Sequence, residues 1–71
     1  MEQHVYEVGV FNARVRKALA EGVRDVALSD DWADIHYFEI LATDEQGART
    51  KLGRRYPAEN GYVITEVRQV R

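Results

Sequence analysis

The sequence contains no cysteine and only one proline among its 71 residues. Without cysteine, the chain forms neither a disulfide bond nor a thiolate metal site, and it has no thiol nucleophile. The lack of cysteine agrees with a reducing compartment, so we expect a cytoplasmic protein.

Long apolar runs are also missing. No stretch approaches the roughly 18 to 20 apolar residues that a bilayer crossing requires. The first residues, MEQHVYEV, lack a basic segment that leads into an apolar run, as a secretion signal would have. We therefore expect no membrane segment and no export signal.

Sequence motifs of enzymes and cofactor sites are absent as well. There is no GxGxxG, Walker A, HExxH or CxxC pattern, so we expect no cofactor. Ser29 and His36 with a nearby aspartate could be written as a triad, but no nucleophile elbow or oxyanion hole accompanies them. Ser29 more simply closes a turn. We expect a protein that is not an enzyme.

The segment DDWAD, residues 30 to 34, matches the letters of the magnesium-binding pattern DDxxD. That pattern places its carboxylates one turn apart on a helix, whereas these precede a predicted strand. Asp34 and His36 could share a divalent ion, but structural zinc sites normally have four ligands. We expect a polar turn and no metal.

The composition and length are those of a folded domain. Hydrophobic residues make up 45% of the chain and charged residues 31%, and the length favours a single domain over residues 1–71. A chain of this size buries only about 60% of its unfolded surface, so its core is thin. Self-association is therefore expected to contribute to stability.

The net charge of −2 is unevenly distributed. Residues 1–46 contain four basic and ten acidic residues, and residues 47–71 contain six basic and two acidic residues. This polarity fits either a nucleic-acid surface or attraction between neighbouring subunits. The sequence pI of about 5.6 argues against a dedicated nucleic-acid module.

The first part of the chain predicts a strand followed by a helix. His4–Phe11 is rich in valine and aromatic residues, although a helical spacing within 8–19 leaves one long N-terminal helix as the alternative. Asn12 is the expected N-cap of a helix over 13–21, and Gly22 the expected left-handed residue after it. Residues 23–31 indicate a surface connection.

Two further strands and a second helix are expected. The strands are Ala33–Ala42 and Tyr62–Val70. Thr43–Tyr56 fits either a hairpin or a helix, and its end chemistry favours the helix. Thr43 and Gln46 match a capping box, and the arginines before Pro57 suit a helix C-terminus. The fold class is therefore α+β, a two-layer sandwich in β-α-β-α-β order with two helices packed on a three-stranded sheet.

Both later strands carry apolar residues on each face. In the last strand, strict alternation places Val63, Thr65 and Val67 on one face and Tyr62, Ile64 and Val70 on the other. If both crossovers are right-handed, the two helices cover one face of the sheet and leave the other open. We expect the open face to carry apolar side chains from both strands: Tyr37, Leu41, Tyr62 and Ile64.

These patterns predict a small non-catalytic protein-interaction or regulatory module that acts as a homodimer or binds a protein partner. The candidate interface comprises Trp32, Tyr37, Leu41, Tyr62 and Ile64, rimmed by Glu39, Glu66 and Arg68. Trp32 has a second interpretation as a core anchor. The alternative function is single-stranded nucleic-acid binding through the sheet aromatics and the basic C-terminal half.

Overall fold

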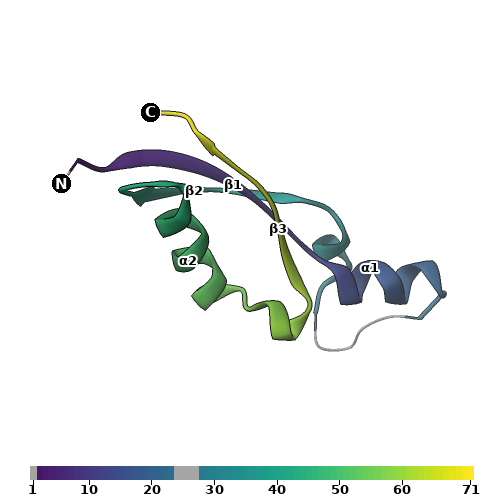
Figure 1. The fold of residues 1–71 in the computed structure, drawn as a ribbon. Coiled ribbons are helices and arrows are strands. Elements are labelled where there is room, and N and C mark those ends of the chain that lie inside the picture. The colour runs from purple at the N-terminus through teal and green to yellow at the C-terminus, as the bar shows by residue number, and fades with distance from the viewer. Residues whose placement is uncertain (1, 24–27) are drawn as a thin grey trace.

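The computed structural model describes residues 2–23 and 28–71 (Figure 1). Its elements are, in chain order, β1 (His4–Asn12), α1 (Ala13–Ala20), the 3-10 helix η1 (Asp30–Ala33), β2 (His36–Ala42), α2 (Glu45–Arg55), the 3-10 helix η2 (Ala58–Asn60) and β3 (Tyr62–Gln69). The strands form one sheet in the order β2-β1-β3, and both neighbouring pairs are antiparallel. The predicted α+β class and the β-α-β-α-β order are confirmed.

Strand β1 runs directly into helix α1 at Asn12. The Asn12 side chain accepts hydrogen bonds from the backbone N–H groups of Arg14 and Val15, at 2.9 and 3.1 Å, and so provides the predicted N-cap. At the other end, Gly22 has a φ of 74°, and the Val23 N–H donates to the Ala18 carbonyl at 2.8 Å. The strand and helix predictions are confirmed, and the single long N-terminal helix is excluded.

Strand β2 begins at His36, three residues later than predicted. The preceding residues form η1, where the Ser29 hydroxyl accepts from the Asp31 N–H at 3.2 Å. Ser29 thus closes a turn as expected. A capping serine followed by two aspartates favours a helical turn, so the extended segment begins later than the predicted Ala33 boundary. Residues 24–27 of the predicted connection lie outside the described residues.

Helix α2 confirms the helical prediction for Thr43–Tyr56, but its cap differs from the expected one. Asp44, not Thr43, is the N-cap, and its Oδ1 accepts from the Gly47 N–H at 2.7 Å. Either residue type caps well, and the carboxylate also interacts favourably with the positive end of the helix dipole. The helix therefore starts one residue later than the Thr43–Gln46 pairing predicted.

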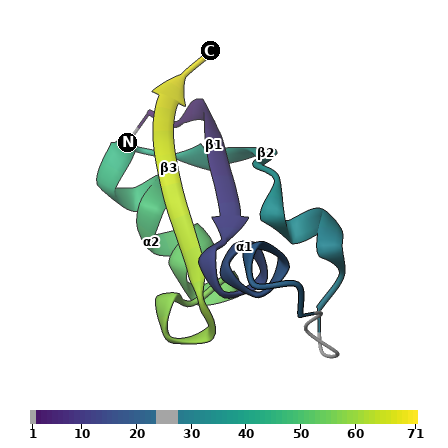
Figure 2. The same ribbon diagram turned by 90° about the vertical axis from the view of Figure 1, so that its right-hand side faces the viewer.

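One face of the sheet carries the core. Helix α2 covers this face, while α1 continues from β1 beyond the end of the sheet (Figures 1 and 2). The core cluster joins β1 to β2 and α2 and comprises Tyr6, Val8, Val10, Ala42, Ala48 and Leu52. Our expectation that both helices cover one face was wrong, because the rule of right-handed crossovers applies to parallel strands. No helix of the described residues is long and apolar enough to span a membrane.

The pairing of β1 with β3 contains a register shift. Gly9 pairs with Glu66, but the next residue, Val10, pairs with Ile64, so Thr65 is an extra residue in β3. Ile64 and Val67 consequently lie on the same face, against the core cluster. The alternation predicted for this strand was therefore wrong beyond Thr65.

Candidate functional site

The face of the sheet that points away from α2 has no covering element among the described residues; we call it the open face (Figure 2). On β1, the residues of this face alternate with the buried Tyr6, Val8 and Val10. Cross-strand partners lie on the same face of a sheet, so the pairing register identifies its other members. The open face therefore extends over all three strands.

Exposed apolar side chains concentrate on this face. Of the six large apolar residues that the described chain exposes substantially, four belong to the open face: Tyr37 at 55%, Leu41 at 53%, Ile35 at 40% and Val63 at 37%. We call these four residues the open-face patch. Single exposed apolar residues are ordinary, whereas a group gathered on one sheet face is typical of an association surface.

Gly9 lies at the centre of the open face. A Cβ atom at this position would lie 2.6 Å from Thr65 Oγ1 and 3.1 Å from Ile35 Cγ2. The Thr65 hydroxyl also donates to the Gly9 carbonyl at 3.2 Å. Neighbouring side chains thus lean over the glycine and fill the space that its missing side chain leaves. The surface therefore has no depression at Gly9, in the middle of the open face.

A charged row crosses the open face between its apolar parts. It comprises Glu39, Glu7 and Arg68, which are neighbours in the strand pairing. Arg68 Nη2 lies 2.8 Å from Glu7 Oε1, and Arg71 Nη2 lies 3.3 Å from Glu39 Oε1. Such exposed pairs contribute about 0 to 1 kcal/mol each, so the row influences orientation more than stability.

The two ends of the open face differ. Near α1, the Arg16 guanidinium lies 3.7 Å from the centre of the Phe11 ring and donates twice to the Ala33 carbonyl, at 3.0 and 2.7 Å. Arg16 therefore covers Phe11 and bounds the patch there. At the opposite end, Val5, Leu41 and Arg71 help to line a hollow of about 310 Å³.

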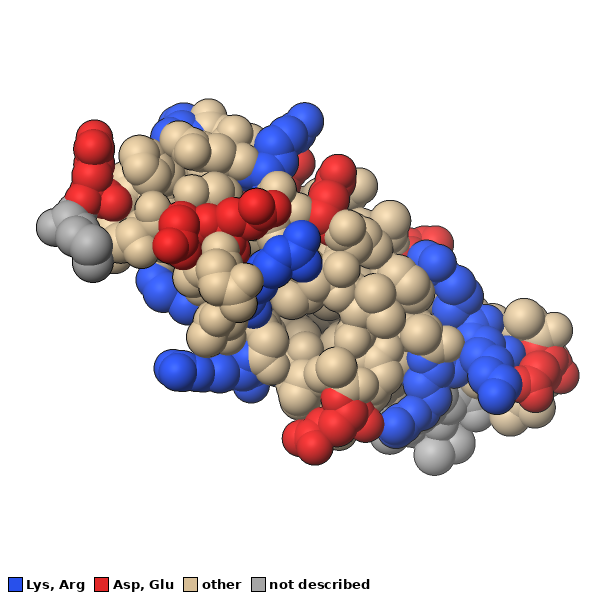
Figure 3. Space-filling model, viewed as in Figure 1, with Lys and Arg blue, Asp and Glu red and all other residues tan. Residues whose placement is uncertain are grey.

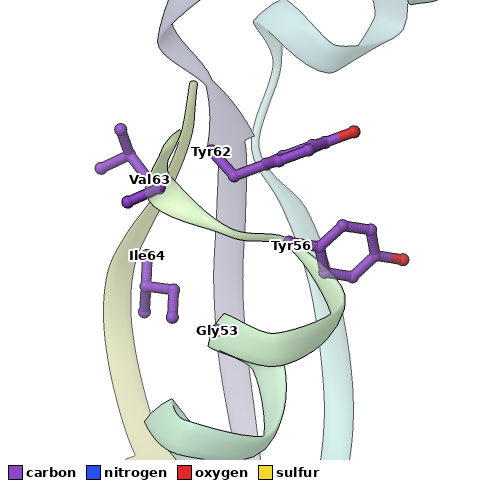
Figure 4. Close-up of a pocket in the computed structure, with 6 residues that line it drawn as sticks. Gly53, Tyr56, Tyr62, Val63 and Ile64 are labelled. Atoms are coloured by element: carbon purple, nitrogen blue, oxygen red, sulfur yellow. The ribbon is translucent and has the colours of Figure 1, made fainter. Parts of the chain in front are cut away.

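A second hollow, of about 370 Å³, lies between the end of α2 and the start of β3 (Figure 4). Its walls are apolar and aromatic and comprise Gly53, Tyr56, Ala58, Tyr62, Val63 and Ile64. Figure 3 shows a largely uncharged area next to the Lys and Arg side chains gathered over α1. No acid–base pair lies among the residues that line the hollow.

The predicted interface residues do not share one surface. Tyr37 and Leu41 lie on the open face, as expected. Tyr62 and Ile64 lie on the other face, where they pack against the core and line the hollow beside α2. The expectation of one face bearing all four was wrong, because the sequence does not specify which side of β3 aligns with which side of β2.

Trp32 also lies on the α2 side, at the edge of the core. Its ring centre is 4.4 Å from that of His36, 5.3 Å from that of Tyr56 and 5.2 Å from that of Tyr62. These contacts give Trp32 the packing of a core-edge anchor, the second of its two interpretations. They also attach η1 to α2 and β3.

The residues considered as candidates for catalysis or metal binding make local structural contacts. His36 Nε2 lies 2.9 Å from the Asp31 carbonyl oxygen, and Ser29 caps η1. No group of three or more His, Asp or Glu side chains in residues 2–23 and 28–71 is placed to hold a metal ion. The turn expected at DDWAD corresponds to η1, in which the Ser29 hydroxyl accepts from the Asp31 N–H.

Sequence reasoning missed two members of the open-face patch. Ile35 lay within the predicted strand Ala33–Ala42 but was not named as an interface residue, and Val63 was assigned to the opposite face from Tyr37. The pairing register was the information required for Val63, since Phe11 opposite Val63 places both residues on one face.

In comparisons with protein-family models, curated proteins and solved structures, no family, relative or structure matched the chain.

Proposed function

We propose that this chain is a small non-catalytic protein-interaction module that acts as a homodimer through the open face of its sheet. The observation that carries the proposal is the open-face patch, which gathers four of the six large apolar side chains exposed in the described chain. As part of the same proposal the module acts in the cytoplasm, an expectation that rests on the absence of cysteine.

The thin core supports this proposal. The fully buried apolar side chains lie on the α2 side of the sheet or, in the case of Val15, on α1. Apolar surface removed from water contributes roughly 25 cal/mol per Å². A second copy seated on the open face would therefore add the second apolar layer that one chain of 71 residues lacks.

Single-stranded nucleic-acid binding is less well supported. The predicted mode stacks bases on Tyr37 and Tyr62 together, with basic side chains along the same surface. Tyr37 lies on the open face, but Tyr62 lies on the opposite face, together with α2 and its basic residues Arg49, Lys51, Arg54 and Arg55. Stacking of bases on both tyrosines would therefore need contact with two faces of the sheet. We advance homodimerisation alone.

Sedimentation equilibrium at micromolar concentration tests the proposal. We expect a species of twice the 8.2 kDa chain mass for the wild type and a monomer for Tyr37→Asp. Val23→Asp is the matched control, because Val23 is 59% exposed but lies after α1, away from the open face. A wild-type monomer across the range, or a dimer that persists in Tyr37→Asp, contradicts the proposal. A dimer that persists in Tyr37→Asp would instead indicate association through β2 or β3, the two edge strands of the sheet.

Titration with random-sequence single-stranded RNA tests the alternative function. We expect no binding at low salt. Binding that weakens steeply as salt rises would instead indicate phosphate contacts. That outcome, with a monomeric protein, would replace the homodimer with the nucleic-acid function.

A further inference from the structure

The hollow between α2 and β3 lies where the helix has no side chain. Gly53 lines it, and a Cβ atom at Gly53 would meet nothing within 4 Å. Tyr62 and Ile64, which form walls of the hollow, also pack against the core cluster. The hollow is therefore an opening at the edge of the core, and an apolar ligand in it would extend the core.

The walls of the hollow offer carbon contacts. The ring centres of Tyr56 and Tyr62 lie 5.2 Å apart, and both phenol hydroxyl groups point away from Val63 and Ile64 (Figure 4). The volume of about 370 Å³ falls within the range of roughly 300 to 1,000 Å³ that small-molecule sites occupy. Tyrosine rings pack well against other aromatic rings, edge to face or offset. These features suit a ligand with an apolar aromatic body.

A cation lies on the same side of α2 as the hollow. Lys51 Nζ donates to the Leu41 carbonyl, so the Lys51 side of the helix faces β2. Gly53 lines the hollow together with residues of β3, so its side of the helix faces β3. Residues four apart in a helix are neighbours on one side. Arg49 therefore lies on the β3 side of α2, one turn before Gly53.

The Arg49 guanidinium is available to an anion. In the described part of the chain its one ion pair is with Glu45, whose Oε1 lies 3.8 Å from Arg49 Nη2. Both side chains are partly exposed to water, so this long pair is weak. The charged side chains of β3 do not compete, because Glu66 and Arg68 belong to the open face. A carboxylate carried by a bound ligand can therefore form a charge-assisted hydrogen bond with Arg49.

We propose that the hollow binds a small aromatic carboxylate, with its ring system between α2 and β3 and its carboxylate at Arg49. A ligand with polar groups on its rings would bury them against carbon, which is unfavourable. The hollow and the open-face patch share Val63 alone, and α2 covers the opposite face of the sheet. Binding at the hollow is therefore a property of the single chain and does not depend on the proposed homodimer.

Titration with 2-naphthoate, followed through amide chemical shifts, tests the site. For a ligand of this size we expect a Kd on the order of 1 mM or tighter. The largest shifts should occur at Gly53, Tyr62 and Ile64. 2-Naphthalenemethanol, which has the same rings without the charge, should bind about two- to fivefold more weakly. Absence of shifts with 2-naphthoate, or largest shifts at Tyr37 and Leu41 on the open face, would overturn the proposal.

Gly53→Leu tests the position of the rings. The leucine side chain enters the hollow, where nothing lies within 4 Å of its Cβ, and leucine is a better helix former than glycine. The variant should fold and bind 2-naphthoate at least about tenfold more weakly. Ala20→Leu, at an exposed position at the end of α1, is the matched control and should bind as the wild type does. Undiminished binding by Gly53→Leu contradicts the site, and if this variant fails to fold, the shift pattern of the wild type decides.

Arg49→Gln tests the position of the carboxylate. It should weaken 2-naphthoate about two- to fivefold and leave the binding of 2-naphthalenemethanol unchanged. Arg54→Gln removes the same charge from an exposed position on another side of α2, and it should affect neither ligand. Unchanged binding of 2-naphthoate by Arg49→Gln, or equal weakening of both ligands, would overturn the assignment of the carboxylate to Arg49.

Discussion

The side-chain amide of Asn12 donates a hydrogen bond to the main-chain carbonyl of Asn60, 3.1 Å away and 48 residues along the chain. The same side chain caps α1 through its oxygen and is fully buried. Gly61, next to Asn60, has a φ of 94° and accepts from the Ala13 N–H at 2.8 Å. One asparagine therefore joins the end of β1, the start of α1 and the turn before β3.

Asn12→Asp is expected to destabilise the fold by about 1 to 3 kcal/mol at neutral pH. Aspartate caps helices as well as asparagine does, but a carboxylate cannot donate to the Asn60 carbonyl. Urea denaturation measures the loss. Asn60→Ala is the control and should change stability by less than about 0.5 kcal/mol, because the main-chain acceptor remains. Equal stability of Asn12→Asp and the wild type would show that the amide donor is unimportant.

Asp44→Ala should cost about 0.5 to 2 kcal/mol of unfolding free energy, through loss of the bond to the Gly47 N–H. Thr43→Ala is expected to be nearly silent, because Thr43 lies one residue before the cap. Thermal unfolding of the two variants side by side separates them. A larger loss of stability for Thr43→Ala than for Asp44→Ala would instead support the capping box that the sequence predicted.

The two glycines of α2 should respond differently to alanine. A Cβ atom at Gly53 meets nothing within 4 Å, so Gly53→Ala is expected to stabilise by up to about 1 kcal/mol. At Gly47 the added atom would lie 3.1 Å from the capping Asp44 Oδ1, which offsets the gain in helix propensity. Melting temperatures should therefore rise for Gly53→Ala and rise less, or fall, for Gly47→Ala. Equal increases would mean that the cap is not tightly held.

Gly9→Ala should destabilise by about 1 to 3 kcal/mol, because its new methyl group would collide with the Thr65 hydroxyl. The double variant Gly9→Ala, Thr65→Ala removes that hydroxyl. Its loss of stability should be smaller than the sum of the two single losses. Additive losses would indicate that the space above Gly9 is limited by Ile35 and Tyr37 rather than by Thr65.

Local sequence chemistry was sufficient to predict the element order. Asn12 and Gly22 mark the two ends of α1, and the helix identity of α2 followed from its acidic start and its basic end before Pro57. Boundaries were less certain where two good caps stand side by side, as Thr43 and Asp44 do. The late start of β2 also comes from a cap, because a serine-capped turn occupies residues up to Ala33.

The composition of the open face could be predicted only in part. Alternation along β2 correctly put Tyr37 and Leu41 on one face. It could not relate that face to either face of β3, because pairing register depends on contacts with β1. The extra residue at Thr65 then inverted the alternation within β3. Tyr62 and Ile64 precede Thr65 and share one face as predicted, but that face was matched to the wrong face of β2, whereas the extra residue changed the face of Val67.

The position of β1 at the centre of the sheet affects the order in which the chain can fold during synthesis. β1 emerges first and can pair with β2 well before β3 is made, but its other edge stays unpaired until the last strand has left the ribosome. An unpaired edge can recruit strands from other chains. A ribosome that stalls before β3 would thus hold a nascent chain whose central strand is an exposed edge, prone to aggregation.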